Sequence, residues 1–171
     1  MKLVGRAAVV TGSSRGVGRS VALAYAAESA DVLVNYSASE APALELVDEI
    51  RSMGRKSVAV PADVASKPEV EHMISVAKAQ FGRLDILVNN AGFTRPNMLH
   101  KMSEDEWGAV VDTHLKGPFL CAQAAFPFFK EQKYGKVINV SSVAGLVGTV
   151  GQVSCSAAKG GILSFTKSVA S

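Results

Sequence analysis

Short apolar runs alternate along the chain with longer stretches in which apolar residues recur every three or four positions. The apolar runs predict five buried β-strands, at 7–10, 31–36, 57–60, 85–89 and 136–140. The periodic stretches between them predict α-helices. Strands that alternate with helices in this way predict an α/β protein with a doubly wound, Rossmann-like parallel sheet. We expect five strands in the order 3-2-1-4-5, with helices on both faces.

The helical stretches carry recognisable start and stop signals. The helices are expected at 14–28, 41–53 and 66–81, then in one long helix from about 103 through residue 118, and from near 155 onward. Ser66–Glu69 and Ser103–Glu106 have the spacing of capping boxes. Pro118 lies inside the long helix and has no N–H, so the carbonyl of His114 is expected to lack its helical partner.

A glycine-rich turn, residues 11–18, joins the first strand to the first helix. A buried strand, a glycine turn and a helix N-terminus together form a typical binding site for a pyrophosphate. The turn has the spacing G-x-x-x-G-x-G, and the residues expected at the anion are Gly12, Ser14, Arg15, Gly16, Val17 and Gly18. The alternative is a glycine turn that binds nothing. A P-loop is excluded, because no Gly-Lys-Ser/Thr follows.

The end of the second strand indicates which dinucleotide is bound. In dinucleotide folds a carboxylate at this position accepts a hydrogen bond from the ribose 2′-hydroxyl and selects NAD. Here Asn35, Tyr36 and Ser37 stand in its place, and Arg15 lies within reach of a 2′-phosphate. We therefore expect NADP(H), with Asn35 and Ser37 beside the adenosine ribose. The alternative for Arg15 is a solvated loop cation.

Polar and small residues follow two further strands. Asp63 and Val64 come after the third strand, where the Asp63 carboxylate could accept from an adenine amino group. Asn90, Ala91 and Gly92 follow the fourth strand. The amides are expected to hold neighbouring loops together, and the small residues leave room for a ribose and a nicotinamide. In each case an ordinary turn is the alternative.

Composition and charge narrow the class of protein. The 171 residues are 48% hydrophobic and 19% charged, which predicts one domain, 1–171, with a substantial core. The net charge of +3 is scattered, so neither a nucleic acid nor a membrane is expected as a partner. Cys121 and Cys155 have no metal-ligand spacing, so we expect no metal site and no disulfide, as in a cytoplasmic protein.

Taken together, these motifs resemble the short-chain dehydrogenase/reductase family. The resemblance rests on Thr11-Gly12-x-x-x-Gly16-x-Gly18, Asp63-Val64, 89–92, Ser142 and Lys159, and it runs across the whole chain. Residues 32–36, 105–107 and 115–117 look most like the bacterial 3-oxoacyl-[acyl-carrier-protein] reductases of fatty acid biosynthesis. The resemblance implies hydride transfer from NADPH to the ketone of an acyl-carrier-protein or CoA thioester. It also implies a homo-oligomer that pairs through the long helix and the last helix.

The same resemblance assigns catalytic roles. A serine binds the ketone oxygen, a tyrosine protonates it, and a lysine binds the nicotinamide ribose and lowers the pKa of the phenol. Ser142 and Lys159 match the serine and the lysine, but Cys155 stands where the family has tyrosine. A phenol is about 6.5 Å long from its Cα and a thiol less than half that, so Cys155 does not reach the position of the proton donor. His114 stands where the family usually has Asn, whose main-chain carbonyl holds a water.

The chain also stops where family members continue into further strands, so we expect missing C-terminal strands and an exposed fifth strand. Two other functions remain open. One is a non-catalytic NADP(H)-binding or interaction subunit. The other is a serine hydrolase, because Ser156-Ala157-Ala158-Lys159 fits the pattern Ser-x-x-Lys, although its companion motifs are absent.

Overall fold

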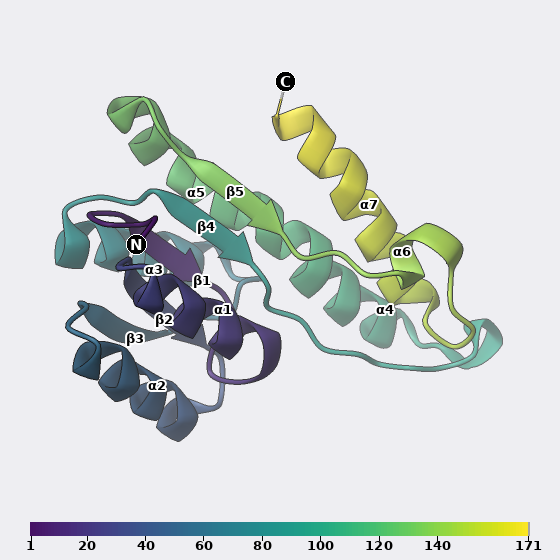
Figure 1. Ribbon diagram of the computed structural model, residues 1–171. Coiled ribbons are helices and arrows are strands. Elements are labelled where there is room, and N and C mark those ends of the chain that lie inside the picture. Colours follow the sequence, from purple (N-terminus) through teal and green to yellow (C-terminus); the bar gives the residue numbers. More distant parts are fainter. Residues whose placement is uncertain (171) are drawn as a thin grey trace.

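The computed structural model describes residues 1–170 and contains one parallel sheet of five strands (Figure 1). The strands lie in the order β3-β2-β1-β4-β5, which confirms the predicted order. Their bounds are β1 Ala7–Val10, β2 Asp31–Tyr36, β3 Ser57–Pro61, β4 Ile86–Asn89 and β5 Lys136–Asn139. Because all five are parallel, their carboxyl ends meet at one edge of the sheet, where ligands of such folds bind.

Helices cover both faces of this sheet (Figure 1). The helices are α1 Gly16–Ala27, α2 Glu40–Ser52, α3 Lys67–Phe81, α4 Glu104–Val111, α5 Gly117–Gln132, α6 Ala144–Val147 and α7 Val153–Val169. A short 3-10 turn, η1 (Leu99–Lys101), and a π-helical turn, η2 (Asp112–Lys116), complete the set. Helices α1 and α2 pack on one face, and α3 and α5 pack on the other. Helix α7 lies against α4, η2 and α6.

Successive side chains of β1 enter the hydrophobic clusters on opposite faces of the sheet, as expected for a sheet with helices on both faces. All four residues of β1 are buried. Val9 faces the cluster formed with α3 and α5, whereas Ala8 and Val10 face the cluster formed with α1 and α2. Packing on both faces of the sheet therefore fixes the strand ends from which the loops at the carboxyl edge begin.

The long helix differs from the prediction, because it is interrupted by η2. The amide of Gly117 donates to the carbonyl of Asp112, five residues earlier, which is the spacing of a π-turn. Pro118, at the start of α5, has no N–H to continue the regular ladder. The single helix of the sequence prediction is therefore three segments, α4, η2 and α5. The free carbonyl at His114 stays a prediction.

One of the two predicted capping boxes is present and one is not. In the box before α4, the Ser103 hydroxyl accepts from the Glu106 amide at 3.1 Å, and the Glu106 carboxylate accepts from the Ser103 amide at 2.8 Å. Before α3, the Ser66 side chain makes no capping bond. The prediction was wrong there because the Glu69 carboxylate accepts from the amide of Asp63 at 2.7 Å instead.

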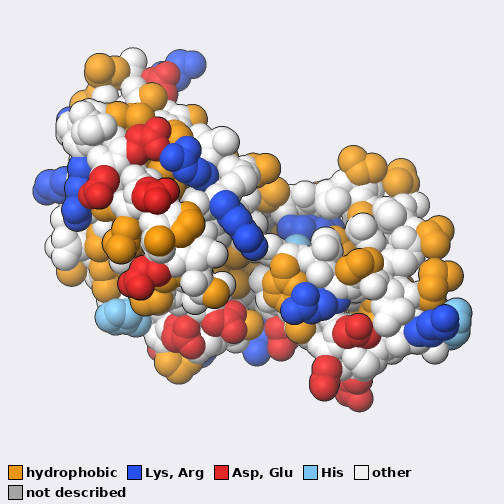
Figure 2. All heavy atoms as spheres, turned by 90° about the horizontal axis from the view of Figure 1, so that it is seen from below, with side chains coloured by type: hydrophobic (Ala, Val, Ile, Leu, Met, Phe, Trp, Pro, Cys, Tyr) orange, Lys and Arg blue, Asp and Glu red, His pale blue; other side chains and the backbone are white. Residues whose placement is uncertain are grey.

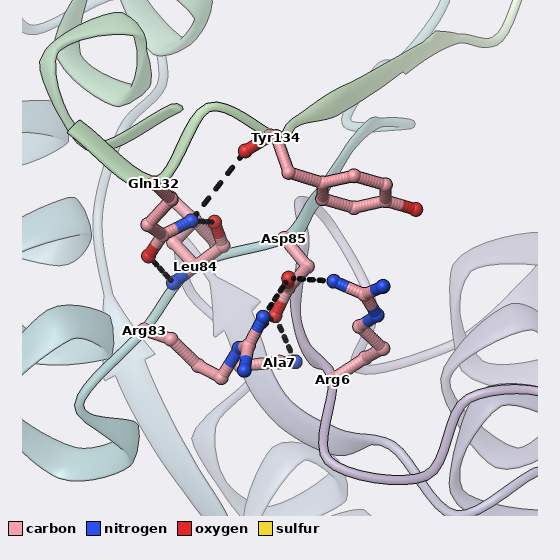
Figure 3. A network of polar contacts seen from close by, with 7 residues as sticks. All are labelled: Arg6, Ala7, Arg83, Leu84, Asp85, Gln132 and Tyr134. Carbon is pink, nitrogen blue, oxygen red and sulfur yellow. Dashed lines mark hydrogen bonds and ion pairs between the residues drawn. The ribbon is translucent and has the colours of Figure 1, made fainter. Parts of the chain in front are cut away.

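The amino end of the sheet is held by a charged network around Asp85 (Figure 3). The carboxylate is completely buried and accepts hydrogen bonds from Arg6, Arg83 and the amide of Ala7. Burial works against ionisation, but these donors outweigh it and lower the pKa of Asp85. The Arg6 guanidinium also lies 4.1 Å from the centre of the Tyr134 ring. This network joins β1 to β4 at the end of the sheet opposite the ligand edge.

Candidate functional site

A cleft of about 890 Å³ opens at the carboxyl ends of the strands. In Figure 2 the molecule is hollowed between the part that carries α2 and β3 and the part that carries α4 and α6. Most of the residues predicted to bind cofactor line this cleft: Gly12, Ser14, Arg15, Gly16, Val17, Asn35, Ser37, Asp63, Val64, Asn90, Ala91 and Gly92. Gly18 and Lys159 are not part of its lining.

The amino terminus of α1 faces this cleft without a cap from the protein. Arg15 occupies the N-cap position but its side chain makes no capping bond, and the first turn has no acidic residue. Gly16 has φ +58° and open space beside it, so a side chain there would be strained but would meet nothing. The first amides of a helix have no intrahelical acceptor and lie at the positive end of its dipole. This end of α1 can therefore bind an anion.

Gly12 and Gly18 also have a packing role, while their predicted place at the anion stays a prediction. The amide of Gly12 donates to the Asn35 side chain at 3.0 Å, so it is not available to a pyrophosphate. A Cβ on Gly12 would lie 2.7 Å from the Cα of Ala91, and one on Gly18 would lie 2.5 Å from the Asn90 amide nitrogen. These two glycines allow the turn to pack closely on the loop after β4.

Asn35 lines the cleft and is also a structural residue, while its place beside the ribose stays a prediction. Its side chain is buried, and its Nδ2 lies within hydrogen-bond distance of the carbonyls of Tyr36, Val60 and Ala62. The amide therefore ties the glycine turn to the ends of β2 and β3. Ser37, by contrast, is exposed and lines the cleft.

Among the described residues, 1–170, no carboxylate lines the cleft at the end of β2. The nearest candidate along the chain, Glu40, starts α2 and accepts a hydrogen bond from the Tyr36 hydroxyl at 3.1 Å. Arg15 is exposed and lines the same cleft. The residues that line the cleft at this point are therefore neutral or positive, and the acidic residues of the lining are Asp63 after β3 and Asp112 at the start of η2.

The loop after β4 is locked to the glycine turn. The Asn90 side chain donates to the carbonyls of Thr11 and Gly12 at 2.9 and 3.1 Å. The Thr11 hydroxyl accepts from the amides of Asn90 and Ala91, each at 3.0 Å. The expected loop-holding role of the amide is thus present. Thr11 was not among the predicted site residues, although a buried hydroxyl beside the turn is a signal that could have identified it.

Asp63 lies at the cleft in a turn of its own. Its carboxylate accepts a hydrogen bond from the amide of Ala65 at 2.9 Å. This bond closes an ordinary turn, which the sequence left open as the alternative for Asp63. The residue nevertheless lines the cleft next to Val64. Val64 also contacts the start of α5, because a Cβ on Gly117 would lie 2.8 Å from its Cγ2.

The residues matched to the catalytic set gather around the end of β5. Lys159 on α7 is buried, and its Nζ donates to the carbonyl of Val140 at 2.5 Å. Burial lowers the pKa of Lys159, and the nearby Cys155 opposes that shift. Cys155 lies one helical turn earlier and is also buried. Ser142 is exposed, and its hydroxyl accepts from the amide of Ala144 at 3.2 Å.

The serine–lysine pair of the hydrolase alternative lacks the contact it would need. A lysine that activates a serine must lie within hydrogen-bond distance of its hydroxyl. The Ser156 hydroxyl has a buried oxygen with no partner among residues 1–170, while Lys159 donates to Val140. Within the same residues, no cluster of three or more His, Cys, Asp and Glu side chains could hold a metal ion. None of their helices is both long and apolar enough to span a membrane.

A doubly wound parallel sheet with an uncapped helix N-terminus on a cleft at its carboxyl edge is the arrangement of Rossmann-like folds. The family model of the short chain dehydrogenases matches residues 6–171. The chain therefore belongs to the short chain dehydrogenase family.

Individual relatives agree with this membership. The chain is 50% identical over 165 residues to the 3-oxoacyl-[acyl-carrier-protein] reductase FabG of Staphylococcus aureus, covering 96% of this chain and 67% of that one. It is 46% identical over 168 residues to the corresponding reductase of Synechocystis, with coverages of 98% and 68%. The chain thus spans about two thirds of the length of the curated relatives it matches.

Solved structures give the same result. A short chain dehydrogenase from Mycobacterium avium superposes with a TM-score of 0.91 at 40% identity, covering 97% of this chain and 62% of that one. A structure from Sinorhizobium meliloti superposes with a TM-score of 0.94 at 38% identity, with coverages of 98% and 66%.

Proposed function

We propose that this chain is an NADP(H)-dependent oxidoreductase that reduces the ketone of a 3-oxoacyl thioester, with a rate limited by Cys155. The observation that carries the proposal is the uncapped N-terminus of α1 on the cleft at the carboxyl edge of the sheet. The names of the relatives from Staphylococcus aureus and Synechocystis supply the substrate class, a thioester of acyl-carrier protein. A CoA thioester offers the same reacting group.

The shape and chemistry of the cleft fit a dinucleotide. When bound, the cofactor would supply or accept the hydride. The amides of Gly16 and Val17 would hold its pyrophosphate, and Ser14 lies beside them in the lining. Asp63 and Val64 would contact the adenine, while Ala91 and Gly92 would leave room for the nicotinamide ribose. By the family resemblance, Lys159 would bind that ribose, although it is not part of the cleft lining.

Charge favours NADP(H) over NAD(H). A 2′-phosphate needs donors and positive charge, whereas an NAD-selective site has a carboxylate at the end of β2. Arg15 and Ser37 line the cleft there, and Glu40 does not. Arg15 is exposed and free to reach a phosphate at this corner.

The reduction itself needs a proton for the ketone oxygen as well as the hydride. Ser142 would donate a hydrogen bond to that oxygen, and the Lys159 ammonium would hold the ribose. The thiol of Cys155 is too short to reach where a phenol from the same position would end. The loss of one well-placed acid costs about 10²–10⁴-fold in rate. We therefore propose tight NADP(H) binding with slow turnover, in which the hydride adds to the carbonyl carbon and a solvent water supplies the proton to the resulting alkoxide oxygen.

The same proposal includes a partner and a location. Helix α5 exposes Phe119 and Phe126, at 45% and 60% of their surface, which fits pairing of a second copy through α4, α5 and α7. We place this homo-oligomer in the cytoplasm. Each copy of the chain would form a single dinucleotide-binding domain. A second candidate function, an NADP(H)-binding subunit without catalysis, is favoured by the buried Cys155 at the position of the acid.

Restoring the acid separates these two functions. NADPH oxidation with a 3-oxoacyl thioester would be followed for the wild-type chain and for Cys155→Tyr, with Cys155→Phe as a control of the same bulk. The reductase proposal expects the tyrosine variant to be about 10²–10⁴-fold faster than the other two. If the tyrosine and phenylalanine variants are equally inactive while both bind NADPH, the subunit function replaces the reductase.

A further inference from the structure

Arg15 and Arg95 differ from the other arginines of the chain. Five of the seven arginine guanidinium groups bond to an acceptor of the protein, namely those of Arg6, Arg19, Arg51, Arg55 and Arg83. Within residues 1–170, the guanidinium groups of Arg15 and Arg95 make no hydrogen bond or ion pair, and both side chains are exposed. A guanidinium carries five N–H donors and is always charged, so each of these two can still bind an anion.

These two arginines belong to opposite halves of the cleft. Arg15 lies in the turn after β1 and lines the cleft near the end of β2. Arg95 lies in the loop after β4, and its guanidinium is 5.1 Å from the centre of the Phe93 ring, which lines the cleft. In Figure 2, basic side chains border the hollow on both of its sides. Because β2 and β4 flank β1 on opposite sides, Arg95 is on the half of the cleft away from the proposed 2′-phosphate.

The loop that carries Arg95 is held on both sides of this residue. Before it, the amide nitrogen and the carbonyl oxygen of Phe93 lie 3.1 and 2.6 Å from Nε2 of His114. After it, the Asn97 amide donates to the carbonyl of Gly151 at 2.9 Å. The face of the Phe93 ring attracts the guanidinium and favours one position for it. Arg95 is therefore presented at the cleft wall before any anion binds.

Two acidic side chains near this loop are already engaged. Glu106 is within electrostatic range of Arg95, but its carboxylate accepts from the Ser103 amide at 2.8 Å in the capping box of α4. Asp112 lines the cleft and pairs with Lys116 at 4.0 Å. The charge of Arg95 is therefore available to a ligand.

We propose that Arg95 binds the 4′-phosphate of the pantetheine arm of the substrate, an inference that rests on the proposed reduction of a 3-oxoacyl thioester. Thioesters of acyl-carrier protein and of CoA share this arm. Strands β4 and β5 are neighbours, so the loop after β4 borders the end of β5, where Ser142 would bind the ketone. A guanidinium can meet a phosphate through two parallel hydrogen bonds. Arg95 is then a specificity-determining residue that selects phosphorylated carriers and takes no part in hydride transfer.

Calorimetric binding of 3-oxobutanoyl thioesters in the presence of excess NADP⁺ tests the inference without turnover. The probes are the thioesters of pantetheine, of 4′-phosphopantetheine and of CoA. We expect the 4′-phosphate to tighten binding to the wild-type chain about tenfold. This gain should vanish in Arg95→Ala and be kept only in part in Arg95→Lys, because an ammonium is a point charge. Arg55→Ala is the control: it removes the same charge from a residue that does not line the cleft, and should keep the full gain.

Three results would overturn the inference. The first is that the wild-type chain binds the pantetheine and phosphopantetheine thioesters equally, or binds neither. The second is a phosphate gain that persists in Arg95→Ala. The third is a tenfold loss of NADPH affinity in Arg95→Ala, which would place Arg95 at the cofactor.

The CoA thioester distinguishes the two sources of the phosphate. A further gain that depends on Arg95 would support CoA as the source, and no further gain would support the arm of the carrier protein. The proposed function fails by a separate observation. It fails if the pantetheine thioester, which has no phosphate, supports no NADPH oxidation by the wild-type chain or by Cys155→Tyr.

Discussion

Gly92 and His114 occupy complementary space. A Cβ built on Gly92 would overlap Cε1 of the imidazole and lie 3.0 Å from its Nδ1 and Nε2. We predict that Gly92→Ala destabilises the chain by about 1–3 kcal/mol, because an extra methyl in a filled site forces its neighbours apart. Urea denaturation would measure the change in the free energy of unfolding.

The same pair allows a double-mutant cycle. The smaller side chain of His114→Ala should remove most of the penalty of Gly92→Ala, giving a coupling of about 0.5–3 kcal/mol. Gly108→Ala in α4 is the matched control, since a Cβ there meets nothing, and helix propensity predicts a gain of up to about 1 kcal/mol. Additive effects of the Gly92 and His114 substitutions would show that the two do not contact each other.

Arg15 is expected to decide the choice between the two nicotinamide dinucleotides. Arg15→Ala should weaken NADPH binding by about tenfold, the equivalent of 1.4 kcal/mol, and leave NADH binding nearly unchanged. The control is Arg19→Ala one helical turn later, where the guanidinium pairs with Glu49 at 2.5 Å and does not line the cleft. Fluorescence titration measures both affinities. An equal loss for NADPH and NADH would remove Arg15 from the 2′-phosphate site.

Asp85 is predicted to be the most costly charge to neutralise. Asp85→Asn should lower the free energy of unfolding by about 2–3 kcal/mol, less than the about 3–5 of a fully buried pair, because Arg6 and Arg83 are partly exposed. Asp48→Asn is the control, since the Asp48–Arg51 pair is exposed and should matter by less than about 0.5 kcal/mol. Chemical denaturation at pH 7 compares the two.

The pH dependence of stability gives Asp85 a second signature. Its pKa is lower in the folded chain than in the unfolded one. The contribution of Asp85 to the free energy of unfolding is therefore complete above its pKa in the unfolded chain, about 3.9. This contribution is lost as the pH falls through the pKa in the folded chain. The wild-type chain should lose more stability than Asp85→Asn as the pH drops below about 4. Parallel stability curves for the two chains in acid would contradict this assignment.

Periodicity was enough to predict the strands and most helix bounds, because burial on both faces requires continuous apolar strands such as β1 and β2. The strand order followed from the alternation of these strands with helices. It failed where tertiary contacts compete with local signals. The Glu69 carboxylate bonds to Asp63 rather than to its own helix cap. Pro118 predicted a freed carbonyl inside one continuous helix, but the sequence did not reveal that the turn before it is π-helical.

The candidate site, like the fold, was predicted only in part from the sequence. Spacing identified which residues reach the cleft, since loops at the carboxyl ends of parallel strands converge. It did not show how their polar atoms are used. Gly12 and Asn35 both line the cleft as expected, but the Gly12 amide donates to the Asn35 side chain at 3.0 Å, so these atoms hold the turn in place. The contact between His114 and Phe93 joins residues 21 positions apart, and no local pattern predicts it.

NADP(H) binding at the N-terminus of α1 underlies the proposed function, and equilibrium titration of the purified wild-type chain with NADPH and with NADH tests it. We predict saturable binding of NADPH, at least about tenfold tighter than that of NADH, from the positive corner at Arg15. Binding of neither dinucleotide, or tighter binding of NADH, would contradict the account.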